Sequence, residues 1–171
     1  MTAIRIYTDG SVSNNGQQNP KGGIGAYFTK NHQELFKLSE YYEYNDEITN
    51  NTCELYAILR VFEILIENNY HKEYSIIELY SDSKYSVSSL TEWILKWKIN
   101  GWKGSSGPVK NKELIQEIHK LHTIILKTCN LEIIHTKNFN HRIPPKNCTN
   151  YIWIGNHRAD ELATIGRKMS K

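Results

Sequence analysis

The sequence predicts an α/β protein with a five-stranded mixed sheet, in which three antiparallel strands and two parallel strands are flanked by helices. Three patterns lead to this class. Alternating apolar residues predict three successive strands near the N-terminus, a 3.6-residue period then marks a long helix, and two later apolar strands are separated by further helices. This order implies a mixed sheet with helices packed on its faces. The length of 171 residues fits a single domain over residues 1–171.

The first strand is expected to run from Ile4 to Asp9, where apolar and polar residues alternate with the two-residue period of a strand. A loop rich in Asn, Gly and Gln follows it. Two further runs, GIGAYFTK and ELFKLSEYYEY, predict strands joined by a tight turn at KNHQ, so the chain opens with an antiparallel meander. On its own, the pair Asp9-Gly10 would indicate a turn, because glycine tolerates a positive φ.

A long amphipathic helix is predicted over TNNTCELYAILRVFEILIENN, with Thr and Asn residues as candidate caps at its start. Its apolar stripe has the i, i+3, i+4, i+7 spacing and consists of Leu55, Ile58, Leu59, Phe62, Leu65 and Ile66. Glu54 is expected in the first turn, beside this stripe. The next segment, SIIELYSD, predicts a central strand with Asp82 at its carboxyl end and Ser83 at the start of a helical stretch.

The last third of the chain is expected to hold two helices and one strand. KELIQEIHKLHTIIL predicts a helix, LEIIHTK predicts the fifth strand, and NHRADELATIGRKM predicts the last helix. The loop from Asn138 to Ile154 is long for a compact domain, so we expect it to be functional or mobile.

Cysteine usage and charge narrow the class of protein. Cys53, Cys129 and Cys148 are odd in number and lack the paired spacing of a zinc or redox site, which favours a reducing compartment. No apolar run approaches membrane-spanning length and no targeting segment is seen, so we expect a soluble, cytoplasmic protein without a membrane partner. A net charge of +3 permits a nucleic-acid partner without indicating one.

Acidic residues are expected to meet at one edge of the sheet. Asp9 and Asp82 share a carboxyl edge if their strands are parallel and adjacent, and Glu54 begins the helix that leads between those strands. Asp160, early in the last helix, could complete the group. Closely packed carboxylates repel one another unless cations neutralise them or protons bind, and Mg²⁺ prefers such oxygen ligands. Taken singly, Asp82 could cap a helix, and Glu54 and Asp160 could each serve a helix N-terminus.

The same residues lie in motifs that resemble those of type 1 ribonuclease H, in the same order and at similar spacings over nearly the whole chain. The motifs are IYTDGS, GGIGAYF, TNNTCEL, YSDSKY, EWILKWKINGWKGSSGPVKNKEL and NHRADELA. The combination is highly specific, whereas TDGS alone would not be. The resemblance implies a ribonuclease H-like fold and Mg²⁺-dependent endonucleolytic hydrolysis of the RNA strand of an RNA–DNA hybrid duplex.

By this resemblance, Asp9, Glu54, Asp82 and Asp160 correspond to the four metal-binding, catalytic carboxylates of the family. The implied mechanism uses two Mg²⁺ ions per site, with Mn²⁺ as a substitute, and leaves 5′-phosphate and 3′-hydroxyl ends. Asp9 would bridge the two ions. The glycine that follows it would give metal and substrate close access to the strand end.

Substrate contacts are implied near the start of the long helix. Asn50 and Asn51 have the spacing of family asparagines that contact nucleic acid in the minor groove, where the 2′-hydroxyl distinguishes RNA from DNA. Helix capping is the alternative for both. Thr49 matches a residue that helps to hold a DNA phosphate, and Ser83, beside Asp82, is a further expected contact.

The loop after the first strand offers another match. Asn19, before Pro20, resembles a substrate-contacting asparagine of the family. Because this loop is a few residues longer than usual, Asn14 or Asn15 could take that place.

The segment from Trp93 to Lys112 holds five lysines, no acidic residue and three tryptophans. It resembles the basic protrusion with which the family grips the DNA side of the duplex, and lysines there would make binding dependent on salt. Two of the tryptophans, Trp93 and Trp97, are four residues apart, so we expect them to pack at the base of the protrusion. The contacts expected from this segment are Trp97, Lys98, Trp102 and Lys103.

The family also carries a histidine on a mobile loop before the last carboxylate helix, and its role is proton transfer or product release. The long loop here offers three candidates, His135, His141 and His157. We assign His135 to the preceding strand and His157 to the helix start, which leaves His141 as the catalytic histidine. We expect a monomer without a separate hybrid-binding domain. A non-catalytic, hybrid-binding member of the fold is the alternative, although it would not explain four retained carboxylates.

Overall fold

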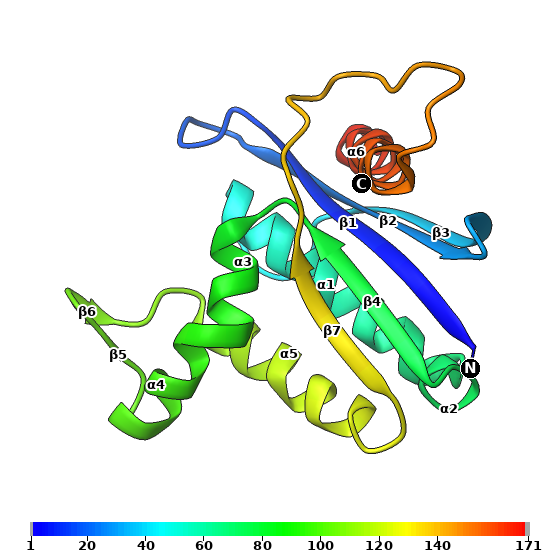
Figure 1. Cartoon of the computed structure of the whole chain (residues 1–171). Coiled ribbons are helices and arrows are strands. Elements are labelled where there is room, and N and C mark those ends of the chain that lie inside the picture. Colours follow the sequence, from blue (N-terminus) through cyan, green and yellow to red (C-terminus); the bar gives the residue numbers. More distant parts are fainter. Residues whose placement is uncertain (1, 170–171) are drawn as a thin grey trace.

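The computed structural model describes residues 2–169 and confirms the five-stranded mixed sheet with helices on both faces (Figure 1). The strand order is β3-β2-β1-β4-β7. β2 pairs antiparallel with β1 and β3, whereas β4 pairs parallel with β1 and β7. The strands are β1 Ala3–Ser13, β2 Lys21–Lys30, β3 Gln33–Tyr41, β4 Ile76–Ser81 and β7 Asn130–His135.

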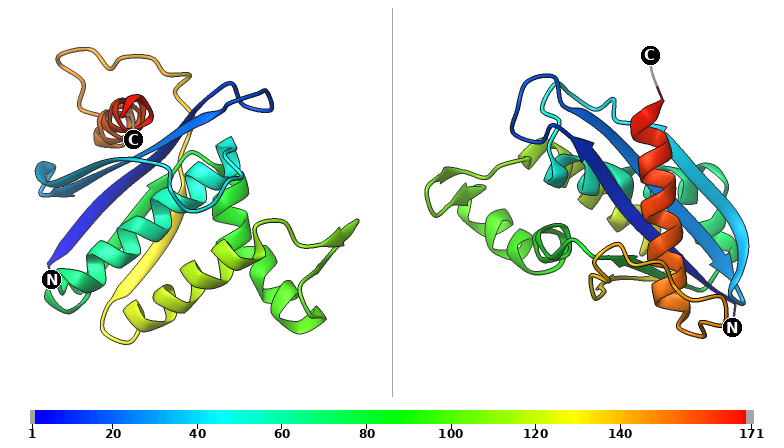
Figure 2. Two further views of the ribbon diagram at one scale, coloured as in Figure 1. Left: turned by 180° about the vertical axis from the view of Figure 1, so that it is seen from behind. Right: turned by 90° about the horizontal axis from the view of Figure 1, so that it is seen from above.

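The helices form two layers. α1 and α5 lie on one face of the sheet, and α6 crosses the other face over β1, β2 and β3 (Figure 2). Between α3 and α4 the chain makes a π-helical turn over Ser89–Trp93, and a short hairpin, β5 Lys103–Gly104 with β6 Gly107–Pro108, follows α4. The helices are α1 Asn50–Glu67, α2 Tyr70–Glu73, α3 Lys84–Ser88, α4 Ile94–Asn100, α5 Lys112–Ile125 and α6 Tyr151–Lys168.

The first strand continues past Asp9, so the expected end at Asp9 is wrong. Its parallel pairing with β4 stops at Thr8 opposite Ser81, but its antiparallel pairing with β2 continues to Ser13 opposite Lys21. The second neighbour supplies backbone hydrogen-bond partners beyond Asp9, which keep the chain extended there. The pair Asp9-Gly10 is therefore part of a strand and not a turn.

Gly10 is explained by the close approach of a helix. A Cβ atom on Gly10 would lie 2.8 Å from the backbone nitrogen of Glu54 and 2.9 Å from the Cβ of Cys53. A side chain at this position would push α1 away from β1. The glycine thus brings the helix close to the strand, which is a different role from the access for metal and substrate that we expected.

The start of α1 follows the expected capping chemistry. The Thr49 hydroxyl accepts a hydrogen bond from the Thr52 backbone, and the Thr52 side chain accepts one from the Thr49 backbone, which is a capping box. Because Thr49 is the cap, Asn50 and Asn51 are not. Glu54 lies in the second turn and not in the first, so the helix N-terminus does not explain its position.

The last helix begins earlier than predicted. Asn150 caps α6 by accepting a hydrogen bond from the Trp153 backbone nitrogen, so the helix starts at Tyr151 instead of Asn156. Its first turns are held by packing of Ile152 against a small cluster of aromatic residues on the sheet. Asp160 therefore lies in the third turn, where the helix N-terminus no longer accounts for a negative charge.

Glycines also bring α6 onto the sheet. A Cβ atom on Gly25 of β2 would lie 2.4 Å from the backbone oxygen of Ala159. The backbone of α6 consequently packs directly on β2 at Ala159, the residue that precedes Asp160.

The structure shows the length and apolar character of the helices and the state of the cysteines. None of the helices in residues 2–169 has the length and apolar character needed to cross a membrane. Cys53, Cys129 and Cys148 are free thiols, and the first two are buried in the core. No disulfide therefore contributes to the stability of the described part of the fold.

Candidate active site

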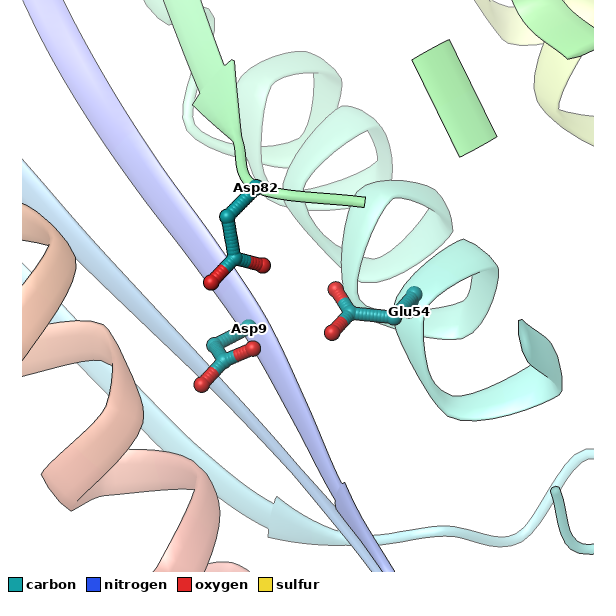
Figure 3. Close-up of side chains that lie close together, drawn as sticks. All are labelled: Asp9, Glu54 and Asp82. Carbon is teal, nitrogen blue, oxygen red and sulfur yellow. The ribbon is translucent and has the colours of Figure 1, made fainter. Parts of the chain in front are cut away.

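Three carboxylates from distant parts of the sequence point toward one another at the edge of the sheet (Figure 3). One oxygen each from Asp9, Glu54 and Asp82 lie within 4.8 Å of one another. Asp9 and Asp82 directly follow Thr8 and Ser81, the last parallel pair of β1 and β4. Glu54 reaches them from α1, which lies against β1 at Gly10. The topology, not local sequence, therefore creates this cluster.

Burial and mutual repulsion both oppose full ionisation of the cluster. Asp9 is only 4% exposed, and its burial, together with the charges of Glu54 and Asp82, raises the pKa of its carboxyl well above the usual value. Burial raises the pKa of Glu54 to about 8, although hydrogen bonds from Asp9 and the Gly10 backbone act in the opposite direction. Burial also raises the pKa of Asp82.

One buried oxygen in the cluster lacks a hydrogen-bond partner. Oε2 of Glu54 is shielded from solvent and has no partner among residues 2–169. An unsatisfied buried carboxylate oxygen is costly in isolation, but it is a suitable ligand for a hard divalent cation. The three carboxylates therefore fit a metal that takes oxygen ligands.

Asp160 lies beside this cluster with a histidine partner. Nδ1 of His141 is 3.3 Å from Oδ2 of Asp160. His141 and Asp160 also act electrostatically on Asp82, His141 lowering and Asp160 raising the pKa of that carboxyl. A small cavity is lined by all three side chains together with Asn156. The charge of Asp160 also raises the pKa values of Asp9 and Glu54, so the fourth predicted carboxylate is coupled to the other three.

The three candidate histidines have different environments. His135 is the last residue of β7, as expected. His157 lies within α6 instead of at its start, and its Nε2 is 3.3 Å from Glu161. Only His141 contacts one of the four carboxylates, and its side chain is 72% exposed.

The residues expected to contact a substrate near the cluster differ in their exposure and in the hydrogen bonds that they form. Asn50 and Asn51 are exposed in the first turn of α1, four and three residues before Glu54. Thr49 and Ser83 use their hydroxyls as helix caps. In the loop after β1, the Asn15 side chain accepts a hydrogen bond from the Asn50 backbone nitrogen at 3.3 Å.

Asn19 has a different position in the same loop. It has a positive φ of 52° and its backbone oxygen accepts a hydrogen bond from the Asn14 side chain at 3.5 Å. Of the three asparagines, Asn15 is therefore the one that the structure brings to the start of α1.

The segment from Trp93 to Lys110, which we call the protrusion, extends away from the sheet (Figures 1 and 2). The rings of Trp93, Trp97 and Trp102 follow one another, with successive centroids 5.9 Å apart. Trp97 and Trp102 pack partly against the core, whereas Trp93 is 42% exposed and packs against the rings of Tyr85 and Trp97.

An open groove of about 640 Å³ runs along the protrusion. Trp93, Trp97 and Lys103 line it. Lys98 lies outside the groove, with its Nζ 3.2 Å from Nε2 of His119. Of the four expected contacts in the protrusion, Trp97 and Lys103 therefore share one concave surface.

Sequence reasoning missed Asn156, which hydrogen-bonds to Asp82. Asn156 lies four residues before Asp160, a spacing that places both side chains on one face of a helix. That spacing was readable in the sequence, because the predicted helix NHRADELATIGRKM contains both residues.

Comparisons with known proteins agree with this arrangement. The family model described as RNase H matches residues 1–168. Ribonuclease H of Chlorobaculum parvum is 36% identical over 167 residues, which are 96% of this chain and 95% of that protein. Human Ribonuclease H1 is 30% identical over 169 residues, or 98% of this chain. The match covers 51% of the human protein, so this chain spans about half the length of that relative.

Solved structures share the fold. The RNase H domain described in "Solution structure of PFV RNase H domain" has a TM-score of 0.74 and 22% identity, with 98% of this chain and 95% of that chain covered. LC11-RNase H1 in complex with RNA/DNA hybrid has a TM-score of 0.61 and 24% identity, with 96% of each chain covered. At these identities the likeness concerns the fold alone.

Proposed function

This chain belongs to the RNase H family of ribonucleases, and from that premise we propose that it cleaves the RNA strand of RNA–DNA hybrid duplexes at internal positions. The observation that carries the proposal is the convergence of Asp9, Glu54 and Asp82 within 4.8 Å, from three separate elements of the fold. A non-catalytic hybrid-binding protein would not need to keep such an unfavourable group of one buried and two half-buried carboxylates.

Asp9, Glu54, Asp82 and Asp160 are the residues proposed to hold two Mg²⁺ ions. When bound, the ions would lower the pKa of the attacking water and neutralise the charge that develops on the phosphate. Two features support this assignment, the unpartnered oxygen of Glu54 and the raised pKa values of the cluster. A divalent cation would be a partner for that oxygen and would stabilise the ionised carboxylates.

The proposed reaction is hydrolysis of a phosphodiester. The oxygen of a water molecule forms a bond to phosphorus, and the bond from phosphorus to the 3′ oxygen breaks. The water oxygen stays on the 5′-phosphate, while the 3′ oxygen takes up a proton and leaves as a hydroxyl. His141, next to Asp160, is suited to transfer this proton or to assist product release.

Recognition of the RNA strand is proposed for the start of α1. Asn50 and Asn51 present amide groups, which donate and accept hydrogen bonds, close to Glu54 and on an exposed helix turn. A 2′-hydroxyl in the wide minor groove of an A-like duplex fits that chemistry. Asn15 supports this turn through the Asn50 backbone, and we propose it in place of Asn19.

The protrusion is proposed to bind the DNA strand. Its lysines would neutralise phosphates, and Trp97 and Lys103 line one groove. All the proposed catalytic groups come from one chain, so we propose that the monomer is active.

The test is cleavage of one labelled strand in matched RNA–DNA, RNA–RNA and DNA–DNA duplexes and in a DNA duplex with a single ribonucleotide, with Mg²⁺ and with EDTA. We expect metal-dependent cutting at several positions in the RNA of the hybrid alone, and Mn²⁺ should support it. Tight hybrid binding without cutting would instead support the non-catalytic alternative.

A further inference from the structure

His141 is held at the tip of a tight turn in the long loop before α6. Asn140 and His141 both have positive φ values, 54° and 57°, and the Arg142 backbone nitrogen donates a hydrogen bond to the Phe139 oxygen at 3.1 Å. The Asn138 side chain accepts a further hydrogen bond from the Asn140 backbone nitrogen. Two successive left-handed residues are uncommon outside glycine, so neighbouring contacts must stabilise this turn.

Trp153, in the first turn of α6, contacts both residues that flank the tip. Its ring stacks on Phe139, with centroids 5.3 Å apart and an interplanar angle of 9°. Its Nε1 donates a hydrogen bond to the backbone oxygen of Arg142 at 3.0 Å, and the Arg142 guanidinium lies over the ring at 5.4 Å. One side chain therefore closes the turn from both sides.

The histidine itself has little to fix its position. Its side chain is 72% exposed. Within residues 2–169, the one ion pair that it forms is with Asp160, at 3.3 Å. Residues 136–150 contain no helix or strand. The position of His141 must therefore depend on the contacts that hold residues 139–142 against α6.

The spacing along α6 relates the two contacts. Trp153 and Asp160 are seven residues apart, close to two helical turns, and so face the same side of the helix. α6 thus carries both Asp160 and the tryptophan that fixes the turn opposite it. The distance between His141 and Asp160 is therefore set by contacts to one helix instead of by the rest of the loop, which has no helix or strand.

We infer that Trp153 is a positioning residue, which holds the turn at residues 139–142 so that His141 faces Asp160. The inference rests on the proposed function, because it presumes that His141 serves the cleavage reaction. It concerns a residue outside the metal-binding set, and no step of the chemistry requires Trp153 to touch the substrate.

The first test is kinetic, with hybrid substrate and saturating Mg²⁺. Trp153→Ala should lower kcat about tenfold, as expected if the competent turn is populated about one-tenth of the time, and should leave KM within about twofold. His141→Ala should lower kcat by roughly 10²–10⁴-fold. Trp153→Ala combined with His141→Ala should be no slower than His141→Ala alone, because the tryptophan acts only through the histidine.

Two further variants serve as rescue and control. Trp153→Phe keeps a ring to stack on Phe139 and should stay within about fivefold of the wild-type kcat, since it loses one hydrogen bond. Tyr151→Ala removes a neighbouring aromatic of the same helical turn, which stacks on His32 at 3.6 Å and does not contact the turn. Its kcat should equal that of the wild type.

The second test needs no activity. In the metal-free protein, the backbone amide of His141 should show an order parameter near that of rigid backbone, about 0.85, and Trp153→Ala should lower it below about 0.6. Tyr151→Ala should leave it unchanged. This measurement is independent of whether the protein cleaves hybrid.

The outcomes separate the two proposals. A rigid His141 that becomes mobile in Trp153→Ala, in a protein that does not cut hybrid, would support the positioning role and overturn the proposed function. Cleavage with a kcat for Trp153→Ala equal to wild type, or additive losses in the double variant, would overturn the positioning role. A wild-type His141 that is already mobile would overturn it as well.

Discussion

The carboxylate cluster and the protrusion differ in how they place their functional side chains. The cluster takes Asp9 from β1, Glu54 from α1 and Asp82 from the residue after β4, and all three depend on the packing of the core. The protrusion takes its lysines and tryptophans from one continuous, exposed segment. The cluster thus holds its charges in buried or half-buried positions, whereas the protrusion carries its lysines in solvent.

This difference predicts different responses to substitution. A buried charge affects stability and chemistry together, because desolvation and repulsion act on the folded state. An exposed lysine is already solvated and affects mainly binding, in a manner that salt screens. Changes in the cluster should therefore be large and coupled, and changes in the protrusion should be small and confined to affinity.

The largest effect is expected from Asp9→Asn. Loss of a carboxylate that holds the ions removes several kcal/mol of transition-state stabilisation, so cleavage should fall at least about 10³-fold. Circular dichroism should show an unchanged fold, and Asp46→Asn, which alters an exposed acid, should cut at the wild-type rate. Cleavage by Asp9→Asn within tenfold of wild type would contradict the proposed site.

Gly10→Ala tests the geometry of the cluster without changing its charge. The added methyl would meet the Glu54 backbone nitrogen at 2.8 Å, so we expect a loss of about 1–3 kcal/mol in stability and a Tm lower by roughly 2–10 °C. The cleavage rate should fall further than the loss of folded protein alone would explain, because the added methyl displaces Glu54. Lys37→Ala, an exposed substitution on β3, is the control and should retain wild-type Tm and cleavage.

The metal-free protein should become less stable as the pH rises. The pKa values of Asp9 and Asp82 are raised and that of Glu54 is about 8, so between ordinary carboxyl values near 4 and about 8 the folded state binds more protons than the unfolded chain. The free energy of unfolding therefore falls with rising pH in this window.

Thermal denaturation in EDTA checks this prediction. The Tm should drop from pH 5 to pH 8 by at least about 2–4 °C more in the wild type than in Asp9→Asn. Mg²⁺ should restore the wild-type Tm at pH 8. Equal pH dependence in both proteins would show that the cluster does not carry the effect.

The smallest effect is expected from Lys103→Ala. If this lysine neutralises one phosphate, hybrid affinity should fall by only a few-fold, and the slope of log K against log salt should become shallower by about 0.7–0.9. Fluorescence anisotropy over a range of salt concentrations measures both. Lys127→Ala, which lies beyond the C-terminal end of α5 and outside the protrusion, is the control. A slope for Lys103→Ala equal to that of Lys127→Ala would exclude Lys103 from the interface.

Regular patterns predicted most of the fold. The turn KNHQ forms the expected hairpin, with Asn31 and His32 at the positive φ values of 50° and 63° that such turns require. The apolar stripe of α1 is largely buried. These features depend on local periodicity and turn chemistry, which a single sequence displays directly.

The errors occur where distant contacts decide the outcome. The end of β1 depends on which neighbouring strand continues to pair, and the start of α6 depends on Asn150 and on the packing of Ile152. The chain also makes a π-helical turn over Ser89–Trp93, which the spacing of four residues did not reveal. The position of His141 depends on Trp153, a contact that no periodicity encodes.

For the candidate site, the expected parallel arrangement of two strands predicts that Asp9, Glu54 and Asp82 lie close together, as they do in the structure. The sequence could not show the burial that raises their pKa values, because burial depends on α1 approaching β1 at Gly10. Nor could it choose among Asn14, Asn15 and Asn19, since all three lie in one loop of similar composition.

The close packing of α6 on β2 at Gly25 determines when, during synthesis, the candidate site becomes complete. The carboxylates of the candidate site are contributed by residues from Asp9 to Asp160, and α6 is synthesised after the other elements that contribute to the site. A nascent chain can pair β1, β2 and β3 early, but it lacks Asp160 until the final helix docks. The proposed nuclease would therefore stay inactive until α6 has been synthesised and has docked on the sheet.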